Sequence, residues 1–250
     1  MVELDSLAER FALNFAAQEE QKALACDGRV AHWNGVSFCD ARSSHWYRNS
    51  VVPTRDLDPE QSDELGERVL EFFSGSTTWV VGTSMQIQPS NGLLINHLSE
   101  ELLVCAGGPI PTPTQSELDI REAREDSDMA DFETAWATAY GHFHLLEPNA
   151  RRYDHRVLGN GHRKWVGYLD GRPVATSASY LHSGVNMIRA ITTHPDYRGR
   201  GIGSAMTLTA MAAGDVPRVL SSEPGVEPLY QGLGFTTVGV FRFWSSPQRR

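Results

Sequence analysis

The chain has 250 residues, of which 40% are hydrophobic and 21% charged, a composition typical of a globular protein of one or two domains. Its net charge of −9 disfavours nucleic-acid partners, because an acidic surface repels phosphates. We find no apolar run long enough to span a membrane and no basic-then-apolar leader, and the three cysteines lack metal-ligand spacing. We therefore expect a cytoplasmic protein with reduced cysteines, no membrane partner and no metal.

The predicted elements of the first half begin with a helix over residues 4–24, where Leu4, Leu7, Phe11 and Phe15 recur at helical spacing. A second helix is expected over residues 59–73, with Asp58 as its N-cap and proline at its first position. β-Prone stretches predict strands at residues 35–41, 49–53, 76–84 and 102–106.

A glycine- and proline-rich segment, residues 107–114, follows these elements and predicts a linker, because prolines fix φ and remove hydrogen-bond donors. The charge balance changes at the same place. Residues 1–115 carry 16 acidic and 7 basic residues, whereas residues 116–250 carry 15 of each. We therefore predict a smaller N-terminal α/β domain over residues 1–115 and a second domain over residues 116–250. The acidic first half favours a cationic partner.

The second half alternates helices with strands joined by tight turns. Helices are expected at residues 125–141, 148–157, 202–213 and 226–232, and strands at residues 117–123, 164–169, 174–181, 186–193, 218–222 and 237–244. The turn at Asp170-Gly171 is a strong hairpin signal. The fold class is therefore α/β (α+β), with a mixed, mostly antiparallel sheet flanked by helices.

The stretch THPDYRGRGIGS, residues 193–204, joins a predicted strand to a predicted helix and indicates an anion-binding loop. The first N–H groups of a helix lack partners within the helix and lie at the positive end of its dipole. The glycines Gly199, Gly201 and Gly203 remove side chains that would keep a diphosphate away from these groups. Arg198 and Arg200 can add charge-assisted hydrogen bonds. A nucleotide cofactor with a pyrophosphate is the expected ligand.

Two cofactor classes fit this loop. The glycines of GRGIG partly match a dinucleotide-binding motif, and Glu223 follows at about the expected distance. However, the strands before the loop indicate a hairpin meander, and too few residues remain after it for a second nucleotide-binding unit. A dinucleotide-dependent oxidoreductase therefore stays the weaker alternative.

For the other class, coenzyme A, the sequence resembles the GNAT superfamily of acyl-CoA-dependent N-acyltransferases. The resemblance lies in RGRGIG, residues 198–203, which match the family signature Q/R-x-x-G-x-G/A, and in PLYQGLGF, residues 228–235, which is similar to the family's LYxxxGF element. It covers about residues 118–244 and implies a GNAT-type sheet. The first half resembles, more loosely, the degenerate N-terminal portion of two-part GNAT proteins.

The resemblance implies acetyl transfer from acetyl-CoA to a small-molecule or peptide amine by direct attack, without a metal. The cosubstrate would be held by Ala190, Ile191, Thr192 and Thr193 of the strand, and by Arg198, Gly199, Arg200, Gly201, Ile202, Gly203 and Ser204 of the loop. Tyr230 matches the family's general acid. Glu223 is the candidate base, or a solvated loop residue.

For the remaining histidine and aromatic side chains, packing or surface positions are expected rather than catalytic roles. His142, His144 and Glu147 fall on the family's acceptor side, but surface or packing roles are expected for the histidines. The aromatic residues Trp136, Trp165, Phe241, Phe243 and Trp244 are interpreted as packing, with one or two available to wall an acceptor pocket. An acyl-CoA-binding or sensing module without turnover is the alternative function, and homodimer formation is left open.

Overall fold

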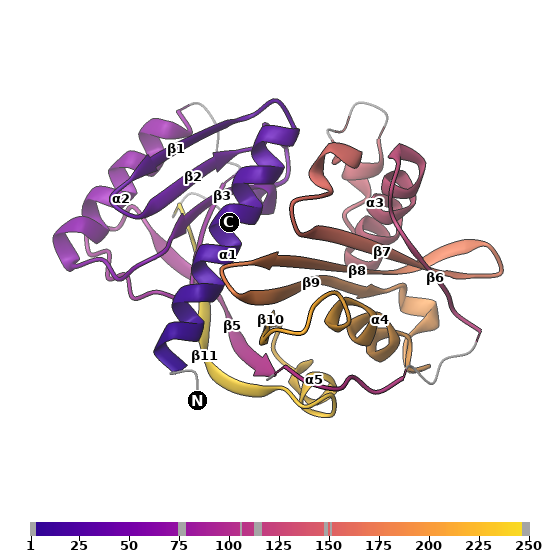
Figure 1. Cartoon of the computed structure of the whole chain (residues 1–250). Coiled ribbons are helices and arrows are strands. Elements are labelled where there is room, and N and C mark those ends of the chain that lie inside the picture. The colour runs from indigo at the N-terminus through magenta and orange to yellow at the C-terminus, as the bar shows by residue number, and fades with distance from the viewer. Residues whose placement is uncertain are drawn as a thin grey trace. The chain divides into compact units, whose positions relative to one another are not determined.

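The computed structural model describes residues 4–74, 79–105, 107–112, 117–147, 150 and 152–246. The chain divides into two compact units, which are described separately here. The first consists of Met1–Leu102, Ser221–Gly225 and Thr237–Arg250, and the second of Leu103–Leu220 and Val226–Thr236. Both are mixed α/β structures with largely antiparallel strand pairing flanked by helices (Figure 1), which is the predicted fold class.

The division of the chain differs from the predicted ranges 1–115 and 116–250. Residues 113–116, where the predicted boundary falls, lie outside the described residues. The last strand, β11 (Thr236–Ser245), was expected in the second domain, yet all but its first residue groups with the first unit. The reason is strand pairing, because β11 runs antiparallel to β4 (Val80–Thr83) with Phe243 opposite Gly82. The C-terminal end of the chain thus returns to the first unit.

The first unit begins with a helix and a three-stranded antiparallel meander. Its elements are α1 (Leu4–Ala25), β1 (Arg29–Trp33), β2 (Val36–Asp40), the 3₁₀ turn Trp46–Arg48, β3 (Asn49–Pro53), α2 (Pro59–Phe72), β4, most of β5 (Ile95–Cys105) and most of β11. Strand β1 was not predicted, because its sequence RVAHW lies largely exposed and lacks a clear apolar alternation. Strand β5 begins seven residues earlier than predicted, in the polar and largely exposed stretch INHLSEE.

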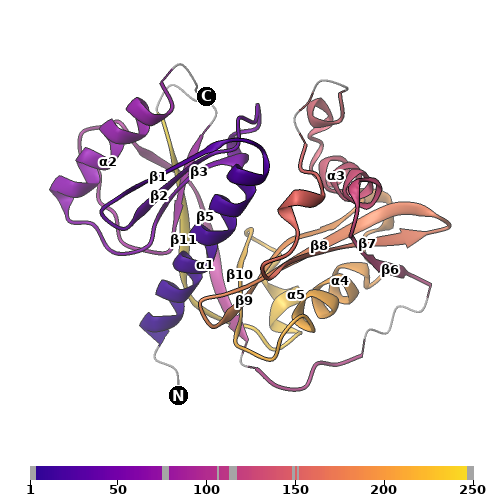
Figure 2. The same cartoon turned by 45° about the horizontal axis from the view of Figure 1, so that its top comes forward.

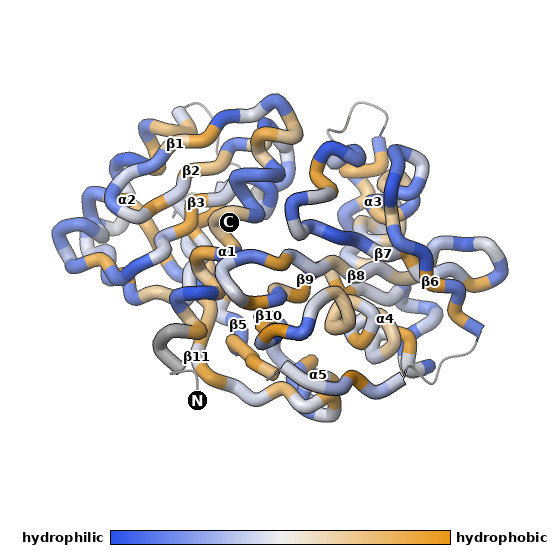
Figure 3. The backbone as a smooth tube through the Cα atoms, in the orientation of Figure 1, coloured by the Kyte–Doolittle hydropathy of each residue, from blue (hydrophilic) through white to orange (hydrophobic). Residues whose placement is uncertain are grey.

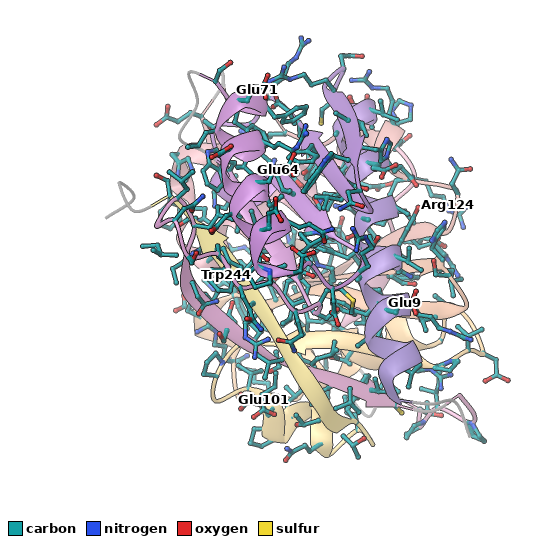
Figure 4. All side chains as sticks on the ribbon, turned by 90° about the vertical axis from the view of Figure 1, so that its left-hand side faces the viewer. Glu9, Glu64, Glu71, Glu101, Arg124 and Trp244 are labelled. Atoms are coloured by element: carbon teal, nitrogen blue, oxygen red, sulfur yellow. The ribbon has the colours of Figure 1, made fainter. Side chains whose placement is uncertain are left out.

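The core of the first unit has two layers, one on each face of the strands. On one face, Leu65 and Val69 of α2 pack with apolar strand residues such as Val81. On the other, the rings of Phe11 and Phe15 on α1 each meet Phe241 of β11 edge to face at 5.2 Å. Glu19 of α1 is buried and paired with Lys22 (2.7 Å), whereas other acidic side chains, such as Glu9 and Glu71, are exposed. Figure 4 shows the glutamates that it labels on α1, α2 and β5, which accords with the excess of acidic residues in the first half.

The second unit also combines helices with a largely antiparallel set of strands. Its elements are β6 (Asp119–Glu122), α3 (Asp126–Tyr140), the 3₁₀ turns Phe143–Leu146 and His155–Val157, β7 (His162–Leu169), β8 (Arg172–His182), β9 (Val185–Thr193), the 3₁₀ turn Pro195–Tyr197, α4 (Ile202–Met211), most of β10 (Arg218–Ser222) and α5 (Glu227–Gln231). The predicted helix over 148–157 is wrong in its described part, where residues 152–154 are irregular and 155–157 form a 3₁₀ turn. Residues 148, 149 and 151 lie outside the described residues.

Two helices sandwich the strands of the second unit. Figure 2 shows α3 and α4 on opposite sides of β7–β9. On the α3 side, Phe132 packs with Val166, Tyr168 and Ala178. On the α4 side, the larger core includes Ala175 and Ile188 of the strands together with Ile202 and Met206 of the helix. Helix α4 carries no charged residue, and Figure 3 shows it mainly in white and orange, as expected for a helix largely surrounded by protein.

The two units share a topology, which agrees with the looser resemblance of the first half to a degenerate GNAT portion. In each, a helix precedes three antiparallel strands, and a second helix leads to a fourth strand that pairs parallel to the third. The series α1-β1-β2-β3-α2-β4 thus corresponds to α3-β7-β8-β9-α4-β10. Among the described residues, both parallel pairings span two register pairs, Ser50–Val51 with Val80–Val81 and Asn186–Met187 with Arg218–Val219. The helix that follows the third strand therefore occupies an equivalent topological position in each unit.

Candidate active site

The glycine loop lies where the sequence predicted it, between β9 and α4. Gly199 and Gly201 have φ of +75° and +78°, a left-handed conformation that residues with a side chain rarely adopt. A Cβ at either position would meet no atom within 4 Å, so the backbone conformation and not local packing requires glycine there. The main chain of the loop is exposed from Arg198 to Gly201. A ligand can therefore approach it closely.

Gly203 serves a different purpose. A Cβ at this position would lie 3.3 Å from Cδ1 of Leu229 on α5 and 3.8 Å from Oγ1 of Thr193 at the end of β9. The missing side chain lets the first turn of α4 approach both α5 and the end of β9. Tyr230 is the next residue on α5 after Leu229. The glycine thus brings the loop, the strand end and the tyrosine-bearing helix together.

The N-terminus of α4 presents main-chain donors. The first bond inside the helix runs from the N–H of Ala205 to the carbonyl of Gly201 (3.1 Å), and no side chain in the described part of the chain caps this end. Its counterpart α2 is closed. There, Asp58 accepts from the N–H of Gln61 (2.8 Å), and the side chain of Gln61 accepts from the N–H of Asp58 in return. The carboxylate of Asp58 occupies the place where an anion would bind. Of the two equivalent helices, α4 of the second unit is therefore the one whose N-terminus is compatible with phosphate binding.

Strand β9 departs from regular pairing just before the loop. Thr176 on β8 pairs with Thr192 and Ala178 pairs with Arg189, so one extra residue is accommodated on β9 between these pairs. Within this bulge Ala190 has φ of +51°, an uncommon conformation for a residue with a side chain. Such strain persists only where surrounding contacts hold it, and it concentrates at functional sites.

The contact that holds the bulge comes from Thr176. Its buried Oγ1 donates to the carbonyl of Ala190 (2.6 Å) and lies 2.7 Å from Oγ1 of Thr192. On the other edge of β9, pairing with β10 covers Asn186 and Met187 among the described residues, and β9 continues for six more residues. Sequence analysis missed Thr176, because a threonine in a strand gives no signal that distinguishes this role.

The two arginines of the loop differ in their contacts. The guanidinium of Arg198 donates from Nε to the carbonyl of Thr193 (3.1 Å) and from Nη2 to the carbonyl of Ala139 near the end of α3 (3.2 Å). It thereby ties the end of β9 to α3. The exposed guanidinium of Arg200 lies over the ring of Tyr197, 5.3 Å from its centroid. Arg198 thus has a structural role besides its predicted contact with phosphate.

The predicted catalytic residues fall in different parts of the fold. Tyr230 on α5 is 7% exposed, belongs to the core beneath α4, and has its ring 6.1 Å from that of Phe235 in an edge-to-face contact. Glu223 is exposed and lies in Ser221–Gly225, which groups with the first unit. The geometry of the second unit therefore includes Tyr230, the loop and the bulge of β9, but not Glu223.

Within the described residues, one group of side chains has the spacing of a metal site: Asp126, Asp154 and His155, whose ligand atoms lie within 4.8 Å of one another. Oδ1 of Asp126 accepts from the backbone N–H of His155 (3.0 Å) and lies 2.7 Å from its Nδ1. Both bonds lower the pKa of Asp126. These contacts explain why the three side chains lie together, because they connect the start of α3 to the turn at His155.

No helix among the described residues is long and apolar enough to cross a bilayer.

Comparisons with known proteins agree with this geometry. Residues 160–237, which include β7–β9, the glycine loop and Tyr230, match the acetyltransferase (GNAT) domain model. The segment 160–237 thus resembles a GNAT domain, and its antiparallel β7–β9 meander argues against a dinucleotide-binding unit. A search of curated proteins finds no match.

Solved structures with low sequence identity share the fold. A GCN5-related N-acetyltransferase from Kribbella flavida is 16% identical, with a TM-score of 0.70 over 96% of this chain and 95% of its own. A putative GNAT-family acetyltransferase from Novosphingobium aromaticivorans is 15% identical, with a TM-score of 0.58 over 92% of this chain and 99% of its own. A functionally unknown conserved protein from Staphylococcus epidermidis is 12% identical, with a TM-score of 0.58 over 88% and 95%. These matches span both halves of the chain.

Proposed function

We propose that the protein is an N-acetyltransferase that moves an acetyl group from acetyl-CoA to an amine by direct attack. The observation that carries this proposal is the uncapped start of α4, preceded by two left-handed glycines and by a bulged strand, within a GNAT domain. General acyl transfer is the chemistry of that domain family. The acetyl donor, the amine acceptor and the absence of a covalent intermediate are the proposed refinements.

The diphosphate of acetyl-CoA would bind the main-chain N–H groups from Gly199 to Ser204, where α4 offers uncompensated donors and the positive end of its dipole. The pantetheine arm would lie along β9 from Ile188 to Thr193, beyond the segment that pairs with β10, and would bond to the strand as an added strand does. The bulge at Ala190 redirects main-chain groups at this point, and an N–H there would polarise the thioester carbonyl.

In the reaction, the nitrogen of a neutral amine attacks the thioester carbon and forms the C–N bond. The C–S bond then breaks, and the thiolate takes a proton. Tyr230 is our candidate donor of that proton, because it is buried on α5 and the preceding residue contacts the first turn of α4. The nitrogen loses a proton to solvent or to a base, for which Glu223 stays our candidate. Holding amine and thioester together supplies much of the acceleration.

The experiment measures release of free thiol from acetyl-CoA with a panel of amines, together with CoA binding by calorimetry. We expect Tyr230→Phe to lower kcat at least about a hundredfold, the lower end of the usual range for a general acid, while the Kd for CoA changes less than about twofold. Tyr180→Phe is the control, because Tyr180 is equally buried but lies near the β8–β9 turn.

Unchanged kcat in Tyr230→Phe would remove its role as the acid. Binding of acetyl-CoA without thiol release on any amine would favour the sensing module instead. Failure of CoA to bind would contradict the whole proposal.

A further inference from the structure

A cluster of ring side chains lies at the end of α3, next to the candidate active site. It consists of Trp136, Tyr140, His142 and His144, and we call it the ring cluster. Trp136 lies 5.3 Å from Tyr140 and 5.5 Å from His142, between ring centroids. The rings of Tyr140 and His142 are stacked at 5.8 Å with an interplanar angle of 18°, and His142 meets His144 at 6.0 Å. The four rings form one connected set.

Local structure holds the ring cluster in place. Gly141 ends α3 in the left-handed conformation, and the N–H of His142 bonds back to the carbonyl of Ala137 (2.8 Å), which turns the chain so that the imidazole packs on the helix. The guanidinium of Arg152 donates to the carbonyls of Leu145 (3.0 Å) and Leu146 and so fastens the turn that follows. The rings are therefore preorganised by main-chain contacts.

One end of the ring cluster is close to the place proposed for the thioester. Trp136 and Ala190 both pack against the same small core of Phe132, Val166, Tyr168 and Ala178. In addition, the guanidinium of Arg198 donates to the carbonyls of both Thr193 and Ala139. A single side chain therefore connects the last turn of α3 to the end of β9. The ring cluster thus begins beside the bulge.

The other end reaches the surface. Tyr140 is 42% exposed, and Phe143, which directly follows His142, is 61% exposed. Large apolar side chains gathered at the surface are typical of a binding surface. The sequence predicted packing or surface roles for the histidines, and packing for Trp136 with a role in an acceptor pocket left open. The ring contacts agree with packing, and they also bring the four side chains together as one strip from the bulge to solvent.

The charges around the strip indicate which amine it suits. Three acidic residues lie between residues 130 and 147: Asp131, which accepts a hydrogen bond from the hydroxyl of Tyr168 (2.9 Å), the buried Glu133, and Glu147. Of the three, only Glu147 is exposed, whereas the guanidiniums of Arg152 and Arg198 both bond to this segment. A polyamine would need several carboxylates and would be repelled by the two arginines. A ring, by contrast, gains from stacked or edge-to-face contacts with aromatic side chains. A single ammonium group is also compatible with aromatic faces.

We propose that the ring cluster binds the acceptor and selects a primary amine carried by a planar aromatic group. This inference rests on the proposed function and concerns the acceptor side of the same site. The aromatic group lies on the Tyr140–His142 end of the strip, and the amine points past Trp136 toward the bulge at Ala190. The rings position the acceptor and take no part in proton transfer.

The test compares 2-phenylethylamine with 2-cyclohexylethylamine, which has a similar shape and apolar area but no π face, at saturating acetyl-CoA. We expect a kcat/KM about three- to tenfold higher for the phenyl compound, the range that aromatic contacts add beyond area. Tyr140→Leu keeps apolar bulk but removes the ring, and it should abolish this preference without changing the KM for acetyl-CoA. Spermidine should be a poor acceptor.

His182→Leu is the matched control. His182 also stacks on a tyrosine, Tyr180, at 5.8 Å and 12°, but it lies at the β8–β9 turn, away from the bulge. This variant should retain the phenyl preference. Equal use of both amines by the unaltered protein, an unchanged preference in Tyr140→Leu, or a preference for spermidine would each overturn the proposal.

Calorimetric binding of the two amines to the protein saturated with CoA separates this proposal from the proposed function. A phenyl preference in binding that Tyr140→Leu removes, without turnover, would support the ring cluster and contradict acetyl transfer. Turnover without any ring preference would do the reverse.

Discussion

Gly201 offers the sharpest test of the loop, because its structural and its binding roles predict different results. In the absence of ligand, a Cβ at this position meets no atom within 4 Å, so Gly201→Ala introduces backbone strain without a clash. A left-handed conformation costs a residue with a side chain about 1–2 kcal/mol. For a chain of this size, that corresponds to a fall in Tm of about 2–8 °C. Gly201→Glu should show the same fall, because its side chain also extends into open space.

The two variants should diverge once CoA is added. The carboxylate of Gly201→Glu would stand near the diphosphate. Two like charges about 5 Å apart at an effective dielectric constant of about 20 repel by about 3 kcal/mol. That is roughly a hundredfold loss in affinity. Gly201→Ala lacks the charge and should lose at most a few-fold. Calorimetric titration with CoA measures the difference.

The hairpin turn at Gly171 supplies the control. Its φ is +74°, and a Cβ there also meets nothing within 4 Å, so Gly171→Ala and Gly171→Glu should carry the same strain. Neither should alter the Kd for CoA. Equal CoA affinities in Gly201→Ala and Gly201→Glu would refute the reasoning, because the carboxylate would then be far from the phosphates. A loss of affinity in the Gly171 variants would show that strain alone explains the effect.

Two further variants test the support of the site and the stability of the second unit. Thr176→Val removes the hydroxyl bonded to Ala190 and should lower the free energy of unfolding by about 1–3 kcal/mol. It should also lower kcat, with little change in CoA affinity. Unchanged kcat would mean that the hydroxyl does not position the bulge. The hydrogen bond from Arg163 lowers the pKa of Glu122 below its ordinary value of 4.5. The stability that the ionised Glu122 contributes is therefore fully present above pH 4.5 and is lost as the pH falls through the lowered pKa. Glu122→Gln should therefore be about 0.5–1 kcal/mol less stable at pH 7, a modest value because both side chains are partly exposed, and the difference in Tm should shrink as the pH falls below 4; a difference independent of pH would contradict this assignment.

The local elements that position the loop could be predicted from the amino-acid sequence. The spacing of apolar residues predicted α1 and α4 closely, and Asp58 followed by proline predicted the start of α2 together with its cap. The glycines of residues 198–203 predicted an exposed loop between a strand and a helix, and the structure places this loop between β9 and α4. These features depend on residues close together in the chain.

Other features of the fold and site depend on contacts between residues that are far apart in the chain. Because β11 pairs with β4, all of it except Thr236 belongs to the first unit, although in sequence it directly follows elements of the second unit. The bulge at Ala190 depends on a hydroxyl fourteen residues earlier, on the neighbouring strand. Helices α2 and α4 occupy equivalent positions in the two units. Their N-termini differ because the side chain of Asp58 caps α2, whereas Gly201 at the start of α4 has no side chain to do so. Side chains at the end of α3, each unremarkable in sequence, become one strip of rings because Gly141 and two arginines fold the chain back beside β9. A linear pattern records local conformation, but strand partners and contacts between distant residues arise only when the chain is packed.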